Sequence, residues 1–359
     1  MLKKYLPNLI GLMAVLLPAQ LSASEQAVRQ LLDQRSCQQC DLRQADLRMQ
    51  DLSGVDLRGA RLDNAMFYQA DLSGARLEGA TLKGASFARS DLRGASMQNL
   101  DLSRGRFSRA NLSGADLRNA NLKEANLEGA DLSAANLSGA RFESAILAGS
   151  RLDNVVLAGA VLDSANLRGV NLTKTADLSG ASFKQTDLRM ARLSGLDLQE
   201  IDFTRARLLK ADLSGANLKQ ARFIDAELKK VAFIDANLHG ANFEGARMHG
   251  AKLKGAKLEA ATLRGMELSG NLIGVDFSNA RISRVRFNGA NLKDAKFRSA
   301  QLEFADFEGA NLYGADFTGA SLHRCNLRKA NLRKTRFDGV DLEGNLLEGA
   351  MGLHQSPVN

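Results

Sequence analysis

The residues that could act as acids, bases or metal ligands are few and scattered in this 359-residue sequence. Among its 4 histidines, His239 and His249 stand ten residues apart, and His323 and His354 are distant from both. Metal and nucleophilic sites need such groups at short, defined spacings, and no nucleophile–base pair or glycine-rich phosphate loop stands out. The sequence therefore predicts no catalytic residue, no metal site, no cofactor and no enzymatic activity.

One short motif has a recognised chemistry, the pair Cys37 and Cys40 with two glutamines between them. In an oxidising compartment these cysteines are expected to form a disulfide. A thiol-redox site is the alternative, but it lacks the βαβ context of such motifs. Zinc would need further ligands nearby, and haem attachment would need histidine where Asp41 stands. We expect a structural disulfide here, and a buried free thiol at Cys325.

The many aspartates belong to a pattern that repeats every five residues, as in 115–119 (Ala-Asp-Leu-Arg-Asn) and 120–124 (Ala-Asn-Leu-Lys-Glu). A small residue is followed by Asp, Asn or Arg, then by Leu or Phe, then by two polar or small residues. A period of five fits neither an α-helix nor a β-strand. Fixed-period self-similarity indicates a solenoid, in which these carboxylates are solvated wall residues rather than general acids or bases.

The phenylalanines give the length of one coil. Eleven of the 16 lie on three series with a spacing of twenty residues: Phe67, Phe87 and Phe107; Phe183, Phe203, Phe223 and Phe243; and Phe277, Phe297, Phe317 and Phe337. This spacing predicts a square coil of four quintets, one quintet per wall. We expect the rings to stack on one wall and leucines to fill the rest of the interior.

With its recurring Ala-(Asp/Asn)-Leu-X-X motif, the chain resembles the pentapeptide-repeat proteins. The resemblance implies an all-β solenoid, a right-handed quadrilateral β-helix, in which Ala115 and Leu117 point inward. It places Asp116, Arg118 and Asn119 outside. About fifteen coils stacked about 4.8 Å apart would make a rod roughly 70–75 Å long.

The repeat changes register twice. Central residues have numbers ending in 2 or 7 up to Leu172, then in 3 or 8 from Leu178 to Leu268, and again in 2 or 7 from Leu272. Thr175 marks an inserted residue, and one residue is lost near Gly270. Each slip is either a bulge, which sheets tolerate, or a recognition feature. Neither is long enough for a linker, so residues 40–349 are expected to form one domain.

Two segments precede the repeat. Residues 1–23 carry Lys3 and Lys4 before a short apolar run, as in a secretory signal peptide. We expect a soluble exported protein, and the resemblance suggests the periplasm or the thylakoid lumen. Residues 24–39 are expected to hold a short N-terminal capping helix, because an open solenoid end needs a cover, and they lead into the cysteine pair with Cys37. The apolar stripe of that helix is Ala27, Val28, Leu31 and Leu32.

After the repeat comes a C-terminal tail, residues 350–359. Near it, four apolar residues either cover the last coil or form a dimer face: Leu346, Leu347, Met351 and Leu353. Homodimerisation through the C-terminal end therefore stays open.

The net charge and its distribution indicate which partners the protein could bind. Some proteins of the family that this chain resembles inhibit DNA gyrase with an acidic surface, but the net charge here is +8, so gyrase is not expected as a partner. Residues 324–336 form a basic belt that could bind an anionic surface: Arg324, Arg328, Lys329, Arg333, Lys334 and Arg336. The alternative interpretation is that these basic residues form an ordinary solvated face whose charge is balanced by nearby acidic residues.

Three aliphatic residues occupy positions that are usually polar, namely Ile146, Val156 and Val161. They predict an apolar band that contacts a protein, or else scattered surface residues without consequence. Taken together, the sequence favours a non-catalytic exported scaffold or protein-interaction module with an unidentified protein partner. The alternative is an anion- or envelope-surface-binding protein that uses the basic belt.

Overall fold

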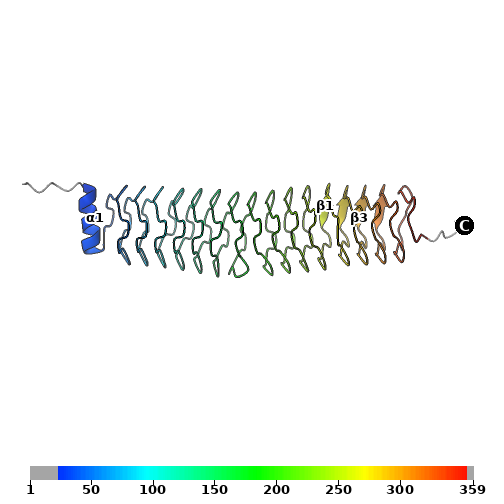
Figure 1. Cartoon of the computed structure of the whole chain (residues 1–359), viewed down its shortest axis with the longest axis horizontal. Coiled ribbons are helices and arrows are strands. Elements are labelled where there is room, and N and C mark those ends of the chain that lie inside the picture. Colours follow the sequence, from blue (N-terminus) through cyan, green and yellow to red (C-terminus); the bar gives the residue numbers. More distant parts are fainter. Residues whose placement is uncertain (1–22, 354–359) are drawn as a thin grey trace, which may run out of the picture.

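The computed structural model describes residues 23–353, which form a long rod of stacked coils (Figure 1). In most quintets an isolated parallel bridge joins the second position to the residue twenty further along, from Ser36–Asp56 at one end to Asn331–Met351 at the other. One coil therefore holds four quintets, as the phenylalanine spacing predicts. Within the described residues, no helix has both the length and the apolar character needed to cross a bilayer.

Each quintet divides its side chains between core and solvent. Ala115 and Leu117 are fully buried, whereas Arg118 and Asn119 are exposed, as the repeat predicts. The last position turns the corner with a left-handed backbone, and φ is 55° at Asn119. At the second position the Asp116 carboxylate accepts the backbone N–H of Arg118 at 3.2 Å. This local hydrogen bond explains why Asp and Asn recur there, because both bond readily to a backbone N–H two residues on.

The four walls are named here by the successive quintets of one coil: wall A by 275–279, wall B by 280–284, wall C by 285–289 and wall D by 290–294. Wall B contains all of the strands in the described residues, namely β1 (Thr262–Arg264), β2 (Arg281–Ser283), β3 (Gln301–Glu303) and β4 (Ser321–His323). They pair in parallel in the order β1-β2-β3-β4, with Arg281 opposite Gln301 and Gln301 opposite Ser321.

The phenylalanine series form stacks inside the rod. The ring centroids of Phe67 and Phe87 lie 4.7 Å apart, and those of Phe277 and Phe297 lie 5.0 Å apart. The expectation that all rings share one wall is wrong. The bridges place the series that begin at Phe67, Phe183 and Phe277 on walls C, B and A, respectively. All four walls offer the same inward slot, so a stack can begin on any of them.

Both register slips are visible in the pairing. The bridge offset is 21 residues at Val156–Asp177 and 19 at Lys257–Asp276. Within the described residues, no backbone hydrogen bond joins 176–180 to 196–200, so wall A is open there. Leu196 fills the small inward position at this seam and is only half-buried. A second opening separates 247–255 from 267–274, where one residue is missing.

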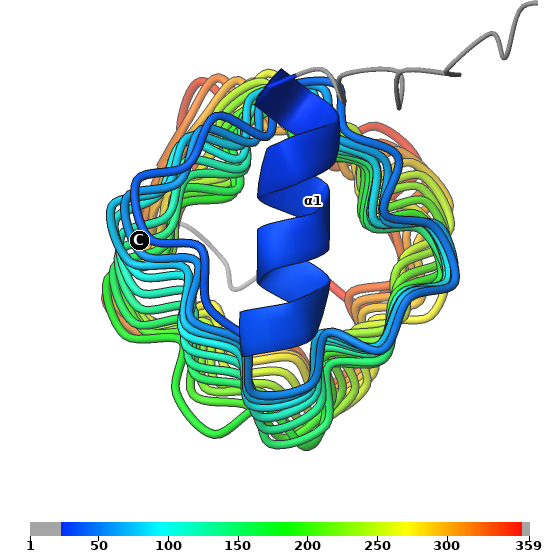
Figure 2. The ribbon, with the colours of Figure 1, turned by 90° about the vertical axis from the view of Figure 1, so that its left-hand side faces the viewer.

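Helix α1 (Ala23–Gln34) lies across the N-terminal end of the coil (Figure 2). Leu31 is fully buried against the core and Ala27 and Val28 are half-buried. Leu32 does not belong to this stripe, since 38% of it is exposed. The predicted signal peptide lies outside the described residues except for Ala23, which begins α1. Likewise, residues 354–359 of the predicted tail lie outside them.

Candidate interaction surface

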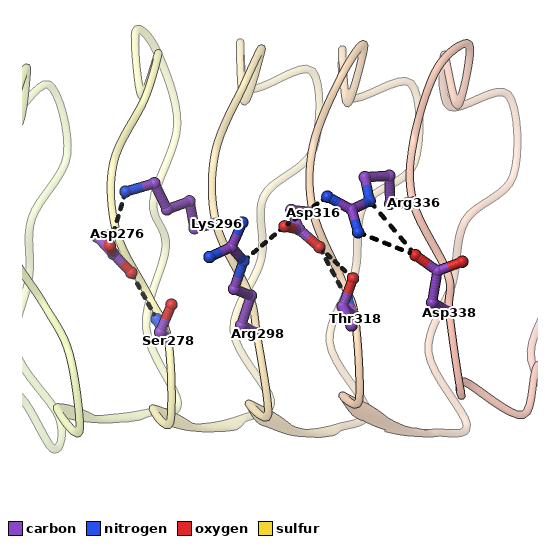
Figure 3. Close-up of polar contacts among 8 residues, drawn as sticks. All are labelled: Asp276, Ser278, Lys296, Arg298, Asp316, Thr318, Arg336 and Asp338. Carbon is purple, nitrogen blue, oxygen red and sulfur yellow. Dashed lines mark hydrogen bonds and ion pairs between the residues drawn. The ribbon is translucent and has the colours of Figure 1, made fainter.

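Charged side chains on wall A neutralise one another along the rod axis. Lys296 Nζ lies 3.2 Å from the Asp276 carboxylate one coil away. Asp316 contacts Arg298 at 2.6 Å and Arg336 at 3.8 Å, and Arg336 also reaches Asp338 at 3.1 Å (Figure 3). Each wall position repeats every coil, so opposite charges twenty residues apart meet on one face.

These contacts hold the carboxylates in their charged form. Burial raises the pKa of Asp316, but hydrogen bonds from Thr318 and Arg298 outweigh it and lower that pKa to about 2. Near the N-terminal end, the Arg43 guanidinium binds Asp41 within the same quintet and lowers the pKa of Asp41 to about 2. Asp41 and Asp316 are thus anionic structural residues, which does not suit proton transfer near neutral pH.

The predicted basic belt does not form one face. Its six residues fall in four successive quintets and therefore on all four walls: Arg324 on wall B, Arg328 and Lys329 on wall C, Arg333 and Lys334 on wall D, and Arg336 on wall A. Several are also neutralised, since Arg328 lies 3.5 Å from Glu348 and Lys329 lies 3.1 Å from Glu308. Consecutive quintets lie on consecutive walls, so charges that are close in sequence are spread around the rod rather than gathered on one face.

The predicted apolar band is also dispersed. Ile146 lies on wall C between Asn126 and Asn166, and it is exposed. Val156 and Val161 are half-buried and lie on walls A and B. Residues ten apart stand on opposite walls, so Ile146 and Val156 cannot share one contact surface.

The histidines also lie on different walls. His239 lies on wall A and His249 on wall C, where the Nδ1 atom of His249 is 3.5 Å from Glu267. His323 lies on wall B, and His354 falls outside the described residues. Between residues 23 and 353, no three His, Cys, Asp or Glu side chains gather as a metal would require.

Two cysteines lie beside α1, and the third lies in the core of the rod. The sulfur atoms of Cys37 and Cys40 are 1.95 Å apart, and the Cys37 Sγ atom also lies 3.4 Å from the Ala27 carbonyl of α1. Cys325 is buried and unpaired, as expected, and burial raises the pKa of its thiol to about 11. Its backbone N–H donates to Asn345 Oδ1 at 2.7 Å.

Wall B carries a surface that the sequence reasoning missed, the arginine patch, defined here as Arg281, Arg284, Phe304 and Arg324. Phe304 stands at a corner rather than at the centre of its quintet, and 37% of it is exposed. The guanidinium carbons of Arg284 and Arg324 each lie 5.8 Å from its ring centroid. A hollow of about 380 Å³ beside it is lined by Thr262, Leu263, Arg264, Arg281, Ser283, Arg284 and Glu303. The out-of-register phenylalanine was the signal that could have revealed this patch.

The fold is a quadrilateral β-solenoid. Its coils of parallel backbone enclose a buried ladder of Leu and Phe, and its four flat walls are polar outside. A family model described as "Pentapeptide repeats" matches residues 40–79, 70–109, 106–149, 135–173, 175–205, 271–309 and 305–344. A second, described as "Pentapeptide repeat region", matches residues 196–273. The chain therefore belongs to the pentapeptide-repeat family, whose members form right-handed quadrilateral β-helices.

Several solved structures are similar. HetL, a pentapeptide repeat protein involved in heterocyst differentiation regulation in the cyanobacterium Nostoc sp. strain PCC 7120, is 30% identical; the match covers 66% of this chain and 96% of HetL, with a TM-score of 0.30. Rfr23 from the cyanobacterium Cyanothece 51142 is 32% identical over 37% of this chain and 97% of its own, with a TM-score of 0.19.

A pentapeptide repeat protein of the Arabidopsis thaliana thylakoid lumen is 23% identical over 37% of this chain and 71% of its own, with a TM-score of 0.17. No curated protein matches the chain.

Proposed function

We propose that this protein is an exported, non-catalytic scaffold that binds a protein partner through its walls. The observation that supports this most directly is the division of each quintet. Its small residue and its central Leu or Phe are buried, and the other three positions form in-register columns along a continuous rod. Solenoids of this kind offer extended binding surfaces rather than enclosed pockets.

In this proposal α1 caps a rod of about fifteen coils stacked at the usual strand spacing. The basic start and apolar run of residues 1–23 support export to a periplasm or thylakoid lumen. The close Cys37–Cys40 pair is consistent with an oxidising compartment. Cell fractionation and N-terminal sequencing of the mature protein test this directly. Recovery of an uncleaved cytoplasmic chain would contradict export.

The binding role is tested by chemical crosslinking in the producing cell, followed by affinity purification of the tagged full chain. We expect a protein adduct that is absent from a control carrying the tag alone. Purification of lipid or an acidic polymer without a protein adduct would instead support the anion-binding alternative. That alternative no longer rests on the basic belt, because its charges lie on four walls.

We further propose that two copies associate through their C-terminal ends. No described helix covers that end, and several apolar residues there stay half-buried: Phe337, Val340, Leu342, Leu347 and Leu353. Leu346 and Met351 point outward from the walls and are each 46% exposed. Light scattering should show a dimer that Leu342→Glu converts to a monomer. A monomer at every concentration of the unmodified chain would contradict this proposal.

A further inference from the structure

The arginine patch differs from the neighbouring part of wall A in how its charges are satisfied. On wall A, Lys296, Arg298 and Arg336 each contact a carboxylate. On wall B, by contrast, no ion pair forms between Arg281, Arg284 or Arg324 and any residue in 23–353. The neighbouring Arg264 pairs with Glu244 at 3.3 Å. Three guanidinium groups on one sheet face therefore keep donors available for an external acceptor.

The ring of Phe304 positions two of these guanidinium groups, those of Arg284 and Arg324. The ring lies between Arg284 on the coil before and Arg324 on the coil after, with both guanidinium carbons 5.8 Å from the ring centroid. An arginine stacked on an aromatic face keeps its in-plane N–H donors free for a carboxylate. The His323 ring also meets Phe304 edge-on, with the ring centroids 6.2 Å apart. With these neighbours, Phe304 acts as a positioning residue for the two arginines.

The residue type at position 304 is unusual for its place in the repeat. Its φ is 52°, a value close to those of the other corner positions of the rod, and it is the sole aromatic among the positive-φ residues of 23–353. The other quintets of wall B between 261 and 324 use Gly or Arg at this corner. The aromatic side chain, rather than the backbone conformation, therefore distinguishes this corner.

The residue types favour a protein as the ligand. The wall B quintets 261–265, 280–284, 300–304 and 320–324 hold four arginines and no lysine. Protein interfaces are enriched in Arg and aromatic residues and depleted in Lys, whereas both cations neutralise phosphate. The Arg side chains border a hollow that is also lined by Thr262, Ser283 and Glu303, and the Ser283 hydroxyl donates to Glu303 Oε2 at 3.4 Å. Guanidinium forks bind carboxylates in a bidentate manner.

We propose that the arginine patch binds an acidic segment of the partner protein, with Arg281, Arg284 and Arg324 contacting its carboxylates. This inference rests on the proposed function, since it names the chemistry of the partner for one wall of the scaffold. The proposed contact surface is the exposed face of β2, β3 and β4.

The test uses the full chain, immobilised by a C-terminal tag, to select from a random peptide display library. We expect enrichment of Asp- and Glu-containing peptides. A selected peptide should bind about tenfold or more weakly to the double variant Arg284→Glu/Arg324→Glu, because two attractive contacts become repulsive. A peptide whose acids are changed to amides should lose binding to the unmodified chain by a similar factor.

The matched control is the double variant Arg89→Glu/Arg109→Glu. Like Arg284 and Arg324, these two arginines occupy exposed, positive-φ corners of a single wall, here one coil apart rather than two, and no carboxylate among residues 23–353 pairs with either. The control changes net charge by the same amount on wall C, so it should leave peptide binding unchanged. Equal loss in both double variants would reduce the effect to overall charge and overturn the proposal.

Phe304 gives an independent readout. Phe304→Leu should weaken binding severalfold by releasing both guanidinium groups, whereas Phe304→Tyr should retain it. Equal binding by both variants and the unmodified chain would refute the positioning role. The thermal unfolding midpoint of each variant shows whether the rod remains folded.

Two further probes separate the ligand classes. Vesicles of phosphatidylglycerol and heparin are tested on the same surface, and tighter patch-dependent binding to either than to any selected peptide would overturn the acidic-protein assignment. Failure of the patch is distinguishable from failure of the proposed function. If cellular crosslinking yields the same protein adducts with the patch variant, the scaffold role stands and the patch assignment is wrong.

Discussion

At the residue scale, Asp316 shows how an outward position contributes to the stability of the rod. Its side chain accepts hydrogen bonds from the Thr318 backbone and hydroxyl and from Arg298. Only 9% of that side chain is exposed. These bonds favour the charged form, which is why its pKa falls to about 2 although burial acts in the opposite direction.

The predicted consequence is a pH-dependent stability. The folded pKa lies below the unfolded value, so the contribution is fully present above about pH 4 and is lost as pH falls towards about 2. Asp316→Asn should cost about 2 kcal/mol at neutral pH and flatten the acid limb of the stability curve. Asp338→Asn, at a position whose side chain is 68% exposed, should change little. Denaturant unfolding at several pH values measures both, and equal effects would refute this role of Asp316.

Asn345 closes the last coil with its side chain. It accepts from the Cys325 N–H at 2.7 Å and donates to the Leu322 carbonyl at 3.2 Å, where the backbone ladder between the last two wall B quintets is absent. Asn345→Ala leaves both backbone groups unsatisfied and should cost about 1–3 kcal/mol. Asn345→Asp keeps the acceptor and should cost less. Denaturant unfolding that ranks the two variants in the opposite order would contradict this account.

At the scale of the element, α1 differs from the walls because it packs through a single narrow stripe. Leu31 is fully buried, whereas the adjacent Leu32 is 38% exposed. Leu31→Ala should therefore cost about 2–5 kcal/mol, while Leu32→Ala, the same change one residue away, should cost far less. Amide exchange in the first coil is the sharper measurement, because a solenoid can unfold from one end. Equal exchange in the two variants would show that α1 is not a cap.

The seam on wall A gives a second prediction at this scale. The amides of Leu178 and Gly180 lack the bonds that the equivalent wall C amides of Leu188 and Met190 make to the next coil. We expect fast hydrogen exchange at the first pair and slow exchange at the second. Leu196→Ala should let the two wall A quintets approach and slow exchange at Leu178. Strong protection in the unmodified chain would show that the wall is closed.

At the scale of the whole molecule, the repeat made the coil length, the inward positions and both register slips predictable. These features depend on periodicity alone. The belt and the apolar band were placed wrongly because residues close in sequence lie on different walls. Contacts between side chains must be counted across coils, twenty residues apart. The seam near Leu196 could not be predicted, because it depends on how a large side chain fits a slot shaped by the coil below.

The difference in ion pairing between wall A and wall B is also a property of the whole rod. Wall A is neutralised by ion pairs between coils, whereas wall B keeps unpaired arginines around Phe304. A rod with one such wall can bind a partner in one orientation, since the other faces present different columns. The proposed scaffold thus has a specific face rather than four equivalent ones.

The most direct test is site-specific photo-crosslinking in the producing cell. A photoreactive phenylalanine replaces Gln301 on wall B or, as the control, Asn291 on wall D; Gln301 is exposed, and Asn291 is half-buried and solvent-facing. We expect a protein adduct from position 301 and a much weaker one from position 291. No protein adduct from either position, in a chain that is folded and exported, would contradict the claim that this protein is a scaffold with a binding wall.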